Sequence, residues 1–223
     1  MKVTTDGCLF GAWVAGKAAA SNHKPRKAID IGAGTGLLSL MLAQKNDLMY
    51  ISSVEIDKDA AYQAMDNFES SPWRNRLSVI FTNIKTFAPF HKSDLIISNP
   101  PFYERELESP DLQKNIAHHS GGLSLDELMG TIALQLEPGG VFYLLLPYKR
   151  KDEIEPLIKK HSLHIYEEVL VSQSTKHSPF RIMVKGGNQE EKEIKKSELS
   201  ICDDNQEYTT AFTEFLKDYY LNL

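Results

Sequence analysis

Short apolar runs alternate with amphipathic stretches over most of the chain. Apolar runs bounded by glycine, proline or polar residues predict buried strands, and they lie at 27–31, 50–55, 77–81 and 94–98. The stretches Leu37–Ala43 and Ala60–Phe68 lie between these runs and place apolar residues at helical spacing. Strands that alternate with helices predict an α/β fold with a mostly parallel sheet covered on both faces.

The second half of the chain continues this alternation. Leu123–Leu136 repeats apolar residues at helical spacing and ends at Glu137–Gly140, where a proline and two glycines stop a helix. After it we expect a strand at 141–146, a helix at 151–160, strands at 165–171 and 180–184, and a closing amphipathic helix at 207–223. The charged stretch Asn188–Ser200 is expected to interrupt the pattern. Near the start, Thr4 or Asp6 is expected to cap a helix that runs through 13–20.

A glycine-rich turn follows the first predicted strand and leads directly into a helix. Such a turn lets the backbone approach a ligand, and a helix N-terminus offers free N–H groups. Gly32, Gly34 and Gly36 are spaced G-x-G-x-G, not the G-x-G-x-x-G of dinucleotide folds. Asp30, just before the turn, would repel a pyrophosphate but suits a cationic ligand with an amino group. Glu55 ends the next strand, where an acid can accept the ribose hydroxyls of an adenosine.

The segment Asn99-Pro100-Pro101-Phe102 closes the apolar run at 94–98. Two consecutive prolines neither continue a helix nor donate to a sheet, so the backbone is stiff here. It presents an amide, a carbonyl and an aromatic face at the carboxyl end of a strand, where open α/β sheets bind ligands. Taken alone, the segment fits a plain proline turn equally well, and the glycine-rich turn upstream favours a binding site.

Length and composition fit one globular domain. The 223 residues are 42% hydrophobic and 25% charged, which is ordinary for a globular protein. We predict a single domain over 1–223, with an N-terminal segment at 1–26, a catalytic core at 27–185 and an acidic tail with a closing helix at 186–223. No apolar stretch is long enough to cross a bilayer, and the first residues lack the core of a signal peptide. Cys8 and Cys202 form no metal or redox spacing, so we expect reduced thiols and a cytoplasmic protein without membrane contact.

The net charge of −5 is unevenly distributed. Residues 186–223 contain nine Asp or Glu and four Lys, so the rest of the chain is neutral overall. Basic residues form two groups. The N-terminal group is Lys2, Lys24, Arg26 and Lys27, and the second group is Lys149, Arg150 and Lys151. Phosphate groups bind where positive charge is locally concentrated, so these two groups permit contact with RNA. Short basic runs are, however, more often solvated surface.

Four motifs in this order give the chain a resemblance to the class I S-adenosylmethionine-dependent methyltransferases. They are Asp30–Gly36, Glu55, Asn99–Phe102 and Leu136–Gly140. The motif N-P-P-F/Y after the fourth strand marks the branch that methylates an amide or an exocyclic amino nitrogen, and the opening Thr5–Trp13 resembles the bacterial tRNA(Val) adenine-37 N6-methyltransferases. The resemblance implies a Rossmann-like fold with seven strands, the last antiparallel. It also implies S-adenosyl-L-methionine as cofactor and a tRNA adenine flipped into the pocket as substrate.

The resemblance also assigns roles to single residues. Asn99, Pro100, Pro101 and Phe102 would be the catalytic motif, in which Asn99 and the Pro100 carbonyl accept hydrogen bonds from the target amino group and Phe102 stacks on the base. The expected cofactor-binding residues are Thr5, Asp6, Asp30, Gly32, Ala33, Gly34, Gly36, Glu55, Ile56, Asn83, Ile84 and Asn99. Taken alone, Asn83 fits a turn equally well. We expect neither a metal nor a covalent nucleophile, since this transfer requires neither.

Other functions share some of these motifs. Protein glutamine N5-methyltransferases of the release-factor type have N-P-P-Y, but they usually add an N-terminal helical domain for which this chain has no room. DNA adenine methyltransferases normally need a target-recognition domain. Ribosomal RNA methylation and a non-catalytic cofactor-binding subunit stay open as alternatives, although Asp30 and Asn99 are both present. The glycine spacing disfavours a dehydrogenase.

Overall fold

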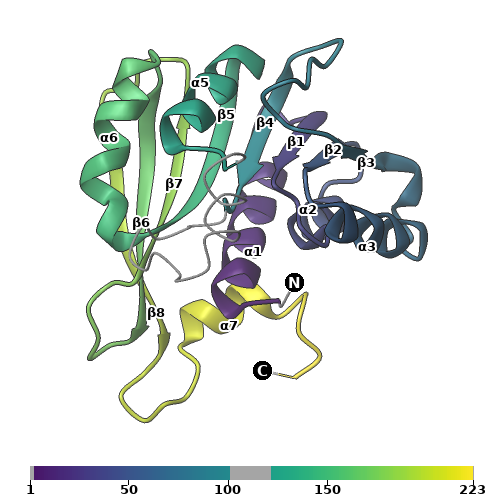
Figure 1. Cartoon of the computed structure of the whole chain (residues 1–223). Coiled ribbons are helices and arrows are strands. Elements are labelled where there is room, and N and C mark those ends of the chain that lie inside the picture. The colour runs from purple at the N-terminus through teal and green to yellow at the C-terminus, as the bar shows by residue number, and fades with distance from the viewer. Residues whose placement is uncertain (1–2, 101–121, 223) are drawn as a thin grey trace, which may run out of the picture.

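The apolar runs pair into one sheet (Figure 1). This computed structural model describes residues 3–100 and 122–222, and in them the strand order is β3-β2-β1-β4-β5-β7-β6-β8. The strands are β1 (Lys27–Ile31), β2 (Tyr50–Glu55), β3 (Leu77–Phe81), β4 (Ser93–Ser98), β5 (Leu136–Pro147), β6 (His164–Ser174), β7 (Arg181–Gly187) and β8 (Lys195–Cys202). All neighbours pair in parallel except β7, which is antiparallel to β5 and β6.

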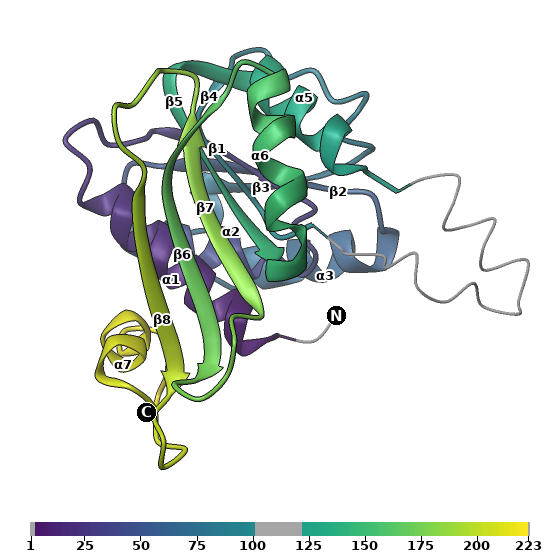
Figure 2. The ribbon, with the colours of Figure 1, turned by 90° about the vertical axis from the view of Figure 1, so that its left-hand side faces the viewer.

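Helices cover both faces of this sheet. They are α1 (Thr5–Ala19), α2 (Leu37–Lys45), α3 (Lys58–Glu69), α5 (Leu125–Gln135), α6 (Lys151–Lys160) and α7 (Thr210–Leu216), with short 3₁₀ turns at Arg74–Arg76 and Tyr148–Arg150. One apolar core lies between the sheet and α1, α2 and α7, and a second lies between the sheet and α5 and α6. Figure 2 shows the two layers on either side of the strands. The predicted α/β fold with a mostly parallel sheet is confirmed.

The expectation of seven strands was wrong, because the charged stretch at 188–200 contains most of an eighth. Strand β8 pairs in parallel with β6 at the edge of the sheet. Its first four residues are exposed, and only Leu199, Ile201 and Cys202 are buried. An edge strand with exposed lysines resists pairing with another chain, but it has no alternating apolar pattern to reveal it. Strand β5 also begins earlier than expected, at Leu136, and an irregularity in its register follows.

The chain changes direction across the sheet between β1 and β4. Ile31 pairs with Ser98, so the segments that begin at Gly32 and Asn99 leave the sheet side by side. Ligands of open α/β sheets bind at such a switch point. We call this end of the sheet, with Ile31, Glu55, Ser98, Pro147 and Ser174, the carboxyl edge. The opposite end, with Lys27, Tyr50, Ser93, Leu136 and His164, is the amino edge. β4, β5 and β6 run downward in Figure 1, toward the first turn of α1.

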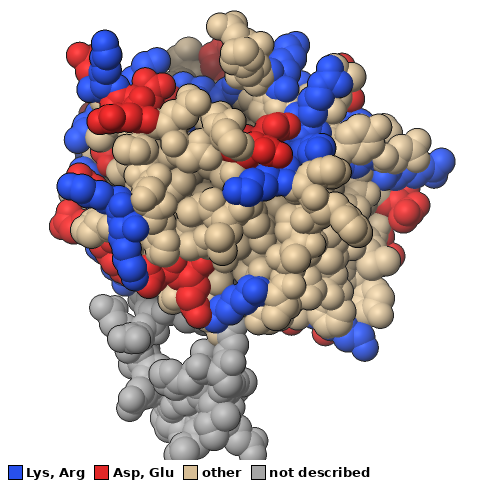
Figure 3. Space-filling view, turned by 90° about the horizontal axis from the view of Figure 1, so that it is seen from above, with Lys and Arg blue, Asp and Glu red and all other residues tan. Residues whose placement is uncertain are grey.

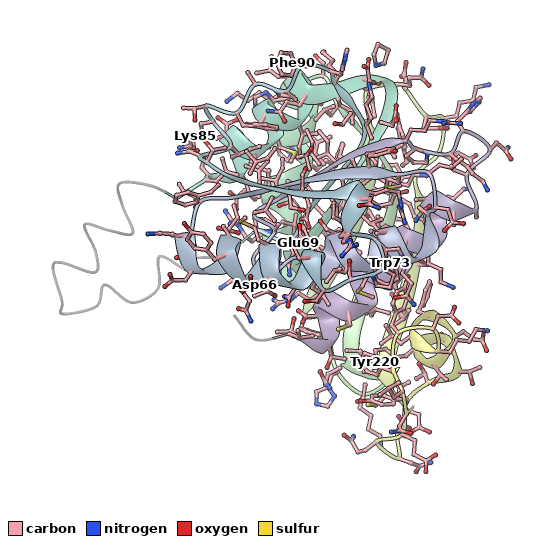
Figure 4. All side chains as sticks on the ribbon, turned by 90° about the vertical axis from the view of Figure 1, so that its right-hand side faces the viewer. Asp66, Glu69, Trp73, Lys85, Phe90 and Tyr220 are labelled. Atoms are coloured by element: carbon pink, nitrogen blue, oxygen red, sulfur yellow. The ribbon has the colours of Figure 1, made fainter. Side chains whose placement is uncertain are left out.

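The acidic C-terminal segment packs against the N-terminal helices. Phe212 and Leu216 of α7 are fully buried in the core that contains α1, as expected for an amphipathic helix in this segment. The Tyr219 hydroxyl donates to the Met41 carbonyl (3.3 Å), and Asp218 pairs with Lys45 at the end of α2. Figure 4 shows Tyr220 beneath α1. This segment therefore stabilises the position of α1 against α2.

Candidate active site

The glycine-rich turn is fixed to the sheet at the switch point. The amides of Gly32 and Ala33 both donate to the Val54 carbonyl, at 2.9 and 3.2 Å. On the other side of β1, the buried Ser98 hydroxyl donates to the Ile31 carbonyl at 2.8 Å. The ends of β1, β2 and β4 are thus hydrogen-bonded to one another where the turn begins.

Gly36 ends the turn and is the N-cap of α2, with a φ of 83°. A Cβ at this position would lie 2.8 Å from Cζ of Phe68 in α3, and closer still to its Cε1. Both the left-handed backbone and the packing against α3 therefore require glycine here. The sequence predicted this turn, but the contact with Phe68 follows only from the fold.

Asp30 lies beneath the turn and is completely buried. Its Oδ2 accepts a hydrogen bond from the Ser39 hydroxyl at 2.7 Å, whereas its Oδ1 has no partner among the described residues. Burial raises the pKa of Asp30 to about 7; the Ser39 hydrogen bond works against this shift and the charge of Glu55 adds to it. A buried acceptor without a donor costs free energy. This carboxyl therefore fits a ligand with a cationic donor, such as the ammonium group of a methionine.

Glu55 joins β2 to the turn. Its Oε2 accepts from the Gly34 amide at 2.7 Å, and its Oε1 accepts from the amides of Ile56 and Asp57, both at 2.8 Å. A carboxylate has about four acceptor positions, so three backbone donors leave room for a further hydroxyl. Glu55 thus supports the glycine turn and retains capacity for a ribose, a combination that the sequence alone did not reveal.

The residues expected beside an adenine ring differ in their surroundings. The Asn83 side-chain oxygen accepts from the Lys85 amide at 3.0 Å, and the Asn83 carbonyl accepts from Thr86 and Phe87, which is the geometry of a turn. Ile84 is buried in the core beneath α5, whereas Ile56 is 54% exposed directly after Glu55. Ile56 is therefore the residue of this group that offers an apolar surface at the carboxyl edge.

Asn99 and Pro100 follow β4 at the carboxyl edge, and Pro100 is buried. The first turn of α1 lies against Asn99, since a Cβ built on Gly7 would be 3.9 Å from its Nδ2. The structure thus brings the N-terminal segment, the glycine turn and the strand end together, as the motifs predicted. Pro101 and Phe102 lie outside the described residues.

Thr5 and Asp6, both expected to bind cofactor, are engaged with the protein. The Thr5 and Cys8 side chains lie next to Tyr220, whose pKa is raised to about 12 by burial and is further influenced by these two neighbours. Asp6 Oδ1 accepts from the Gly7 amide at 3.1 Å, and Oδ2 accepts from Nε of Arg181 at 2.7 Å. Both residues lie in the first turn of α1, next to the site.

The two basic groups lie at opposite edges of the sheet. Lys24, Arg26 and Lys27 precede or begin β1, at the amino edge, whereas Lys149, Arg150 and Lys151 follow β5, at the carboxyl edge. Arg150 pairs with Glu153 at 2.7 Å, and Lys151 lies 5.9 Å from the Tyr148 ring centroid. Only the second group shares an edge with Asn99. Lys2 lies outside the described residues.

Sequence reasoning missed three residues that shape the site, Ser39, Ser53 and Arg181. Ser39 and Ser53 are fully buried, and their hydroxyls are hydrogen-bonded to each other at 2.7 Å beneath the turn. The available signal was a serine at a core position of an otherwise apolar helix or strand. No local pattern indicated that Arg181 would contact Asp6.

Residues 3–100 and 122–222 contain neither a membrane-spanning helix nor a cluster of metal-binding side chains. No helix there is long and apolar enough to cross a membrane. No group of three or more His, Cys, Asp or Glu side chains there is arranged to hold a metal ion.

Several known proteins with similar sequences or folds are methyltransferases by name. The family model of the methyltransferase small domain matches residues 18–159. A tRNA1(Val) (adenine(37)-N6)-methyltransferase of Parabacteroides distasonis is 35% identical over 100% of this chain and 92% of its own length. The protein of the same name from Flavobacterium johnsoniae is 35% identical over 100% of this chain and 94% of its own length. A crystal structure from Agrobacterium tumefaciens, described as a predicted O-methyltransferase, has a TM-score of 0.73 at 14% identity and covers 97% of this chain and 99% of that one.

Proposed function

Because the chain belongs to the family of the bacterial tRNA1(Val) (adenine(37)-N6)-methyltransferases, we propose that it transfers a methyl group to the exocyclic N6 of a tRNA adenine. The methyl donor is S-adenosyl-L-methionine, and adenine 37 of tRNA(Val) is the proposed target. Because its substrate is tRNA, we place the enzyme in the cytoplasm. The observation that supports this proposal is the position of Asn99 and Pro100 at the same edge as Asp30, whose buried carboxyl has an oxygen without a donor.

The residues around the turn match the chemistry of the donor. Asp30 has the free buried acceptor that an ammonium group requires. Glu55 retains acceptor capacity for a ribose hydroxyl, and Ile56 offers an exposed apolar side chain after it. We assign the methionine end to Asp30 and Gly32–Gly36, the ribose to Glu55 and the adenine ring to Ile56, with Asn83 and Ile84 shaping the turn behind it.

The chain's contribution to transfer is to present acceptors to the target amine. The lone pair of an aryl amine is delocalised into the ring, which makes it a poor nucleophile. Asn99 Oδ1 and the Pro100 carbonyl can each accept one N–H, which draws both bonds out of the ring plane and frees the lone pair. When bound, S-adenosylmethionine supplies a methyl group already activated on a sulfonium. The rest of the catalysis is alignment and electrostatic stabilisation by these acceptors.

The target base must reach Asn99, so we propose that the tRNA lies against the carboxyl edge. Lys149, Arg150 and Lys151 lie at that edge, and we assign phosphate contacts to them. Lys24, Arg26 and Lys27 lie at the other end of β1 and have no such role in this proposal. A base leaves its stack to enter such a pocket, and the phosphate contacts hold the flanking backbone while it does so.

Methyl transfer from labelled S-adenosylmethionine into separate pools tests the proposed function. We would offer the enzyme total RNA, ribosomes and a release-factor protein pool, and then analyse the labelled nucleosides and amino acids. The proposal expects N6-methyladenosine in the tRNA fraction. Label in a protein glutamine would instead support the N5-methyltransferase alternative, and label in ribosomal RNA would change the substrate. Cofactor binding without transfer to any pool would contradict the proposal and favour a non-catalytic subunit.

A further inference from the structure

Helix α1 is attached to the sheet by an ion pair at each end. In its first turn, Asp6 Oδ2 pairs with Nε of Arg181 at 2.7 Å. In its last turn, Nζ of Lys17 lies 2.8 Å from both carboxylate oxygens of Glu167 in β6. The two pairs are similarly buried, with the acids 13% and 14% exposed and the cations 30% and 37% exposed. They differ in position, since only the first pair lies at the carboxyl edge.

Arg181 reaches α1 because β7 is the antiparallel strand of the sheet. It is the first residue of β7 and pairs with Pro147 and Val171, near the ends of β5 and β6. A parallel strand in this place would begin at the amino edge instead. The antiparallel direction therefore brings the start of β7 beside the end of β5 and the first turn of α1 (Figure 1).

The first turn of α1 is hydrogen-bonded internally and lies close to Asn99. Thr4 Oγ1 caps the helix by accepting from the Gly7 amide at 3.3 Å, and Asp6 Oδ1 accepts from the same amide at 3.1 Å. A Cβ on Gly7 would be 3.1 Å from Thr4 Oγ1 and 3.9 Å from Nδ2 of Asn99. The backbone at Gly7 therefore lies close to the Asn99 amide, since an added Cβ would be in van der Waals contact with it.

The charge on Asp6 strengthens this connection. Burial alone would raise its pKa, but the hydrogen bond with Thr4 and the charge and hydrogen bond of Arg181 bring the pKa below the ordinary value. Asp6 is therefore ionised at neutral pH and attracts the guanidinium. A charge-assisted hydrogen bond of this kind is about twice as strong as a neutral one.

We propose that Arg181 is a positioning residue for methyl transfer, which holds Asp6 and thereby fixes the first turn of α1 against the Asn99 amide. This inference rests on the proposed role of Asn99 as an acceptor for the target amine. An acceptor amide must keep its geometry within a fraction of an ångström, since a displacement of about 1 Å can lower the rate about 100-fold. Arg181 acts on the reaction through Asp6 and Gly7 and has no contact with the reacting atoms in this proposal.

The test compares Arg181→Met with Lys17→Met in the full chain. Each variant removes the cation of one α1 ion pair and keeps an apolar stem of similar length. We expect Arg181→Met to lower kcat for tRNA by about 10- to 100-fold, with the Kd for S-adenosylmethionine and the KM for tRNA within about threefold. Lys17→Met should change kcat by less than about threefold, and Arg181→Lys should recover most of the loss. Equal losses of kcat in the two Met variants, or a loss confined to KM for tRNA, would overturn the inference.

A second readout does not depend on activity. The side-chain amide resonance of Asn99, assigned by its absence in Asn99→Ala, should shift in Arg181→Met and stay in place in Lys17→Met. Amide exchange should accelerate at residues 6–10 in the first variant alone. If the Asn99 resonance does not move in Arg181→Met, the inference is wrong whether or not tRNA is methylated. If it moves but the wild type methylates no RNA, the proposed function fails while the connection between Arg181 and Asn99 stands.

Discussion

The two edges of the sheet differ in their polar groups and in what these groups bond. At the amino edge several backbone groups are bonded by side chains: Asp94 Oδ2 accepts from the amides of Arg26 and Lys27 at 2.8 and 2.9 Å. Asn188 there accepts from the Gly139 amide and donates to the Glu137 carbonyl. At the carboxyl edge, Asp30 keeps an oxygen without a donor. Buried polar groups are normally paired, and the described residues contain one unpaired atom near each edge, Asp30 Oδ1 and, beside the start of β5, Gln135 Oε1. What distinguishes the carboxyl edge is that its unpaired atom belongs to an ionisable carboxyl beneath the glycine turn.

The outer surface at the amino end also differs from a nucleic-acid surface. Exposed apolar side chains there include Leu48, Tyr50, Phe90 and Leu134, and Phe90 lies at the opposite end of the molecule from Tyr220 (Figure 4). Figure 3 looks down on the top of the molecule and shows Lys and Arg interspersed with Asp and Glu, beside a wide area without charged side chains. Phosphate binding needs clustered cations, whereas the cations of this face are mixed with acidic side chains.

Replacing an asparagine at each edge should give the largest contrast. Asn99→Ala removes one of the two acceptors for the target amine, and we expect turnover to fall by about 10²- to 10³-fold. Affinity for S-adenosylmethionine in calorimetry should stay within about threefold, because the lost hydrogen bond goes to the substrate. Asn188→Ala should leave kcat unchanged and lower the free energy of unfolding by about 1–3 kcal/mol, since two backbone groups lose their partner. If Asn99→Ala instead lost cofactor binding as severely as turnover, Asn99 would hold the cofactor.

Gly36 and Gly139, one at each edge of the sheet, allow the same comparison for side-chain packing. Gly36 and Gly139 have φ values of 83° and 81°, so alanine is strained by about 1–2 kcal/mol at either. At Gly36 the added Cβ also overlaps Phe68, whereas at Gly139 it meets only the Gln189 side chain, with Nε2 at 3.4 Å. We expect Gly36→Ala to cost about 2–4 kcal/mol in urea unfolding and to weaken cofactor binding, and Gly139→Ala to cost only the backbone strain. Equal costs would show that the turn can relax away from α3.

The buried carboxyl of Asp30 gives a smaller effect that depends on pH. Its pKa is about 7 in the folded chain and about 4 when unfolded. Between these two pKa values Asp30 is protonated in the folded state and ionised in the unfolded state. Its contribution to the free energy of unfolding is therefore full below about pH 4 and is lost as the pH rises to about 7. Relative to Asp30→Asn, the free energy of unfolding of the ligand-free wild type should fall across this range. Asp30→Asn should also weaken S-adenosylmethionine binding. A constant difference between the two proteins from pH 5 to 8 would mean that Asp30 titrates normally.

The basic groups should give the smallest effect, visible mainly in its salt dependence. Lys149→Gln with Lys151→Gln should raise KM for tRNA several-fold and reduce the slope of log K against log salt by about 1–2, one unit for each lost phosphate contact. Arg150 is left unchanged so that its ion pair with Glu153 stays intact. The matched double variant Lys24→Gln with Lys27→Gln, at the amino edge, should change neither quantity. A larger effect from the second pair would place the tRNA across the other end of β1.

The sequence predicted the parts of the site that consist of consecutive residues. The turn Gly32–Gly36 and the position of Asn99 after a strand were readable because a strand end, a glycine run and a proline pair are local signals. The separation of the two basic groups could also be predicted from the sequence, because Lys27 precedes a strand and Lys149 follows one. In a parallel sheet that difference alone assigns them to opposite edges.

Features that depend on distant segments were not readable. Strand β8 is an edge strand with exposed Lys195 and Lys196, so it lacks the alternation that reveals a half-buried strand. The contact between Asp6 and Arg181 joins residues 175 positions apart and exists because β7 runs antiparallel. Glu55 was expected to bind ribose, but its hydrogen bond to the Gly34 amide depends on how the turn folds back over β2.

The most direct test of the whole account is the location of the methyl group on a defined tRNA. The enzyme would be incubated with labelled S-adenosylmethionine and either a tRNA(Val) transcript or the same transcript with guanine in place of adenine 37. Mass spectrometry of the nucleosides and fragments would then place the label. The account predicts one N6-methyladenosine per molecule at position 37 of the first transcript, no transfer to the second and almost none to either with Asn99→Ala. Equal methylation of both transcripts, or full activity of Asn99→Ala, would contradict it.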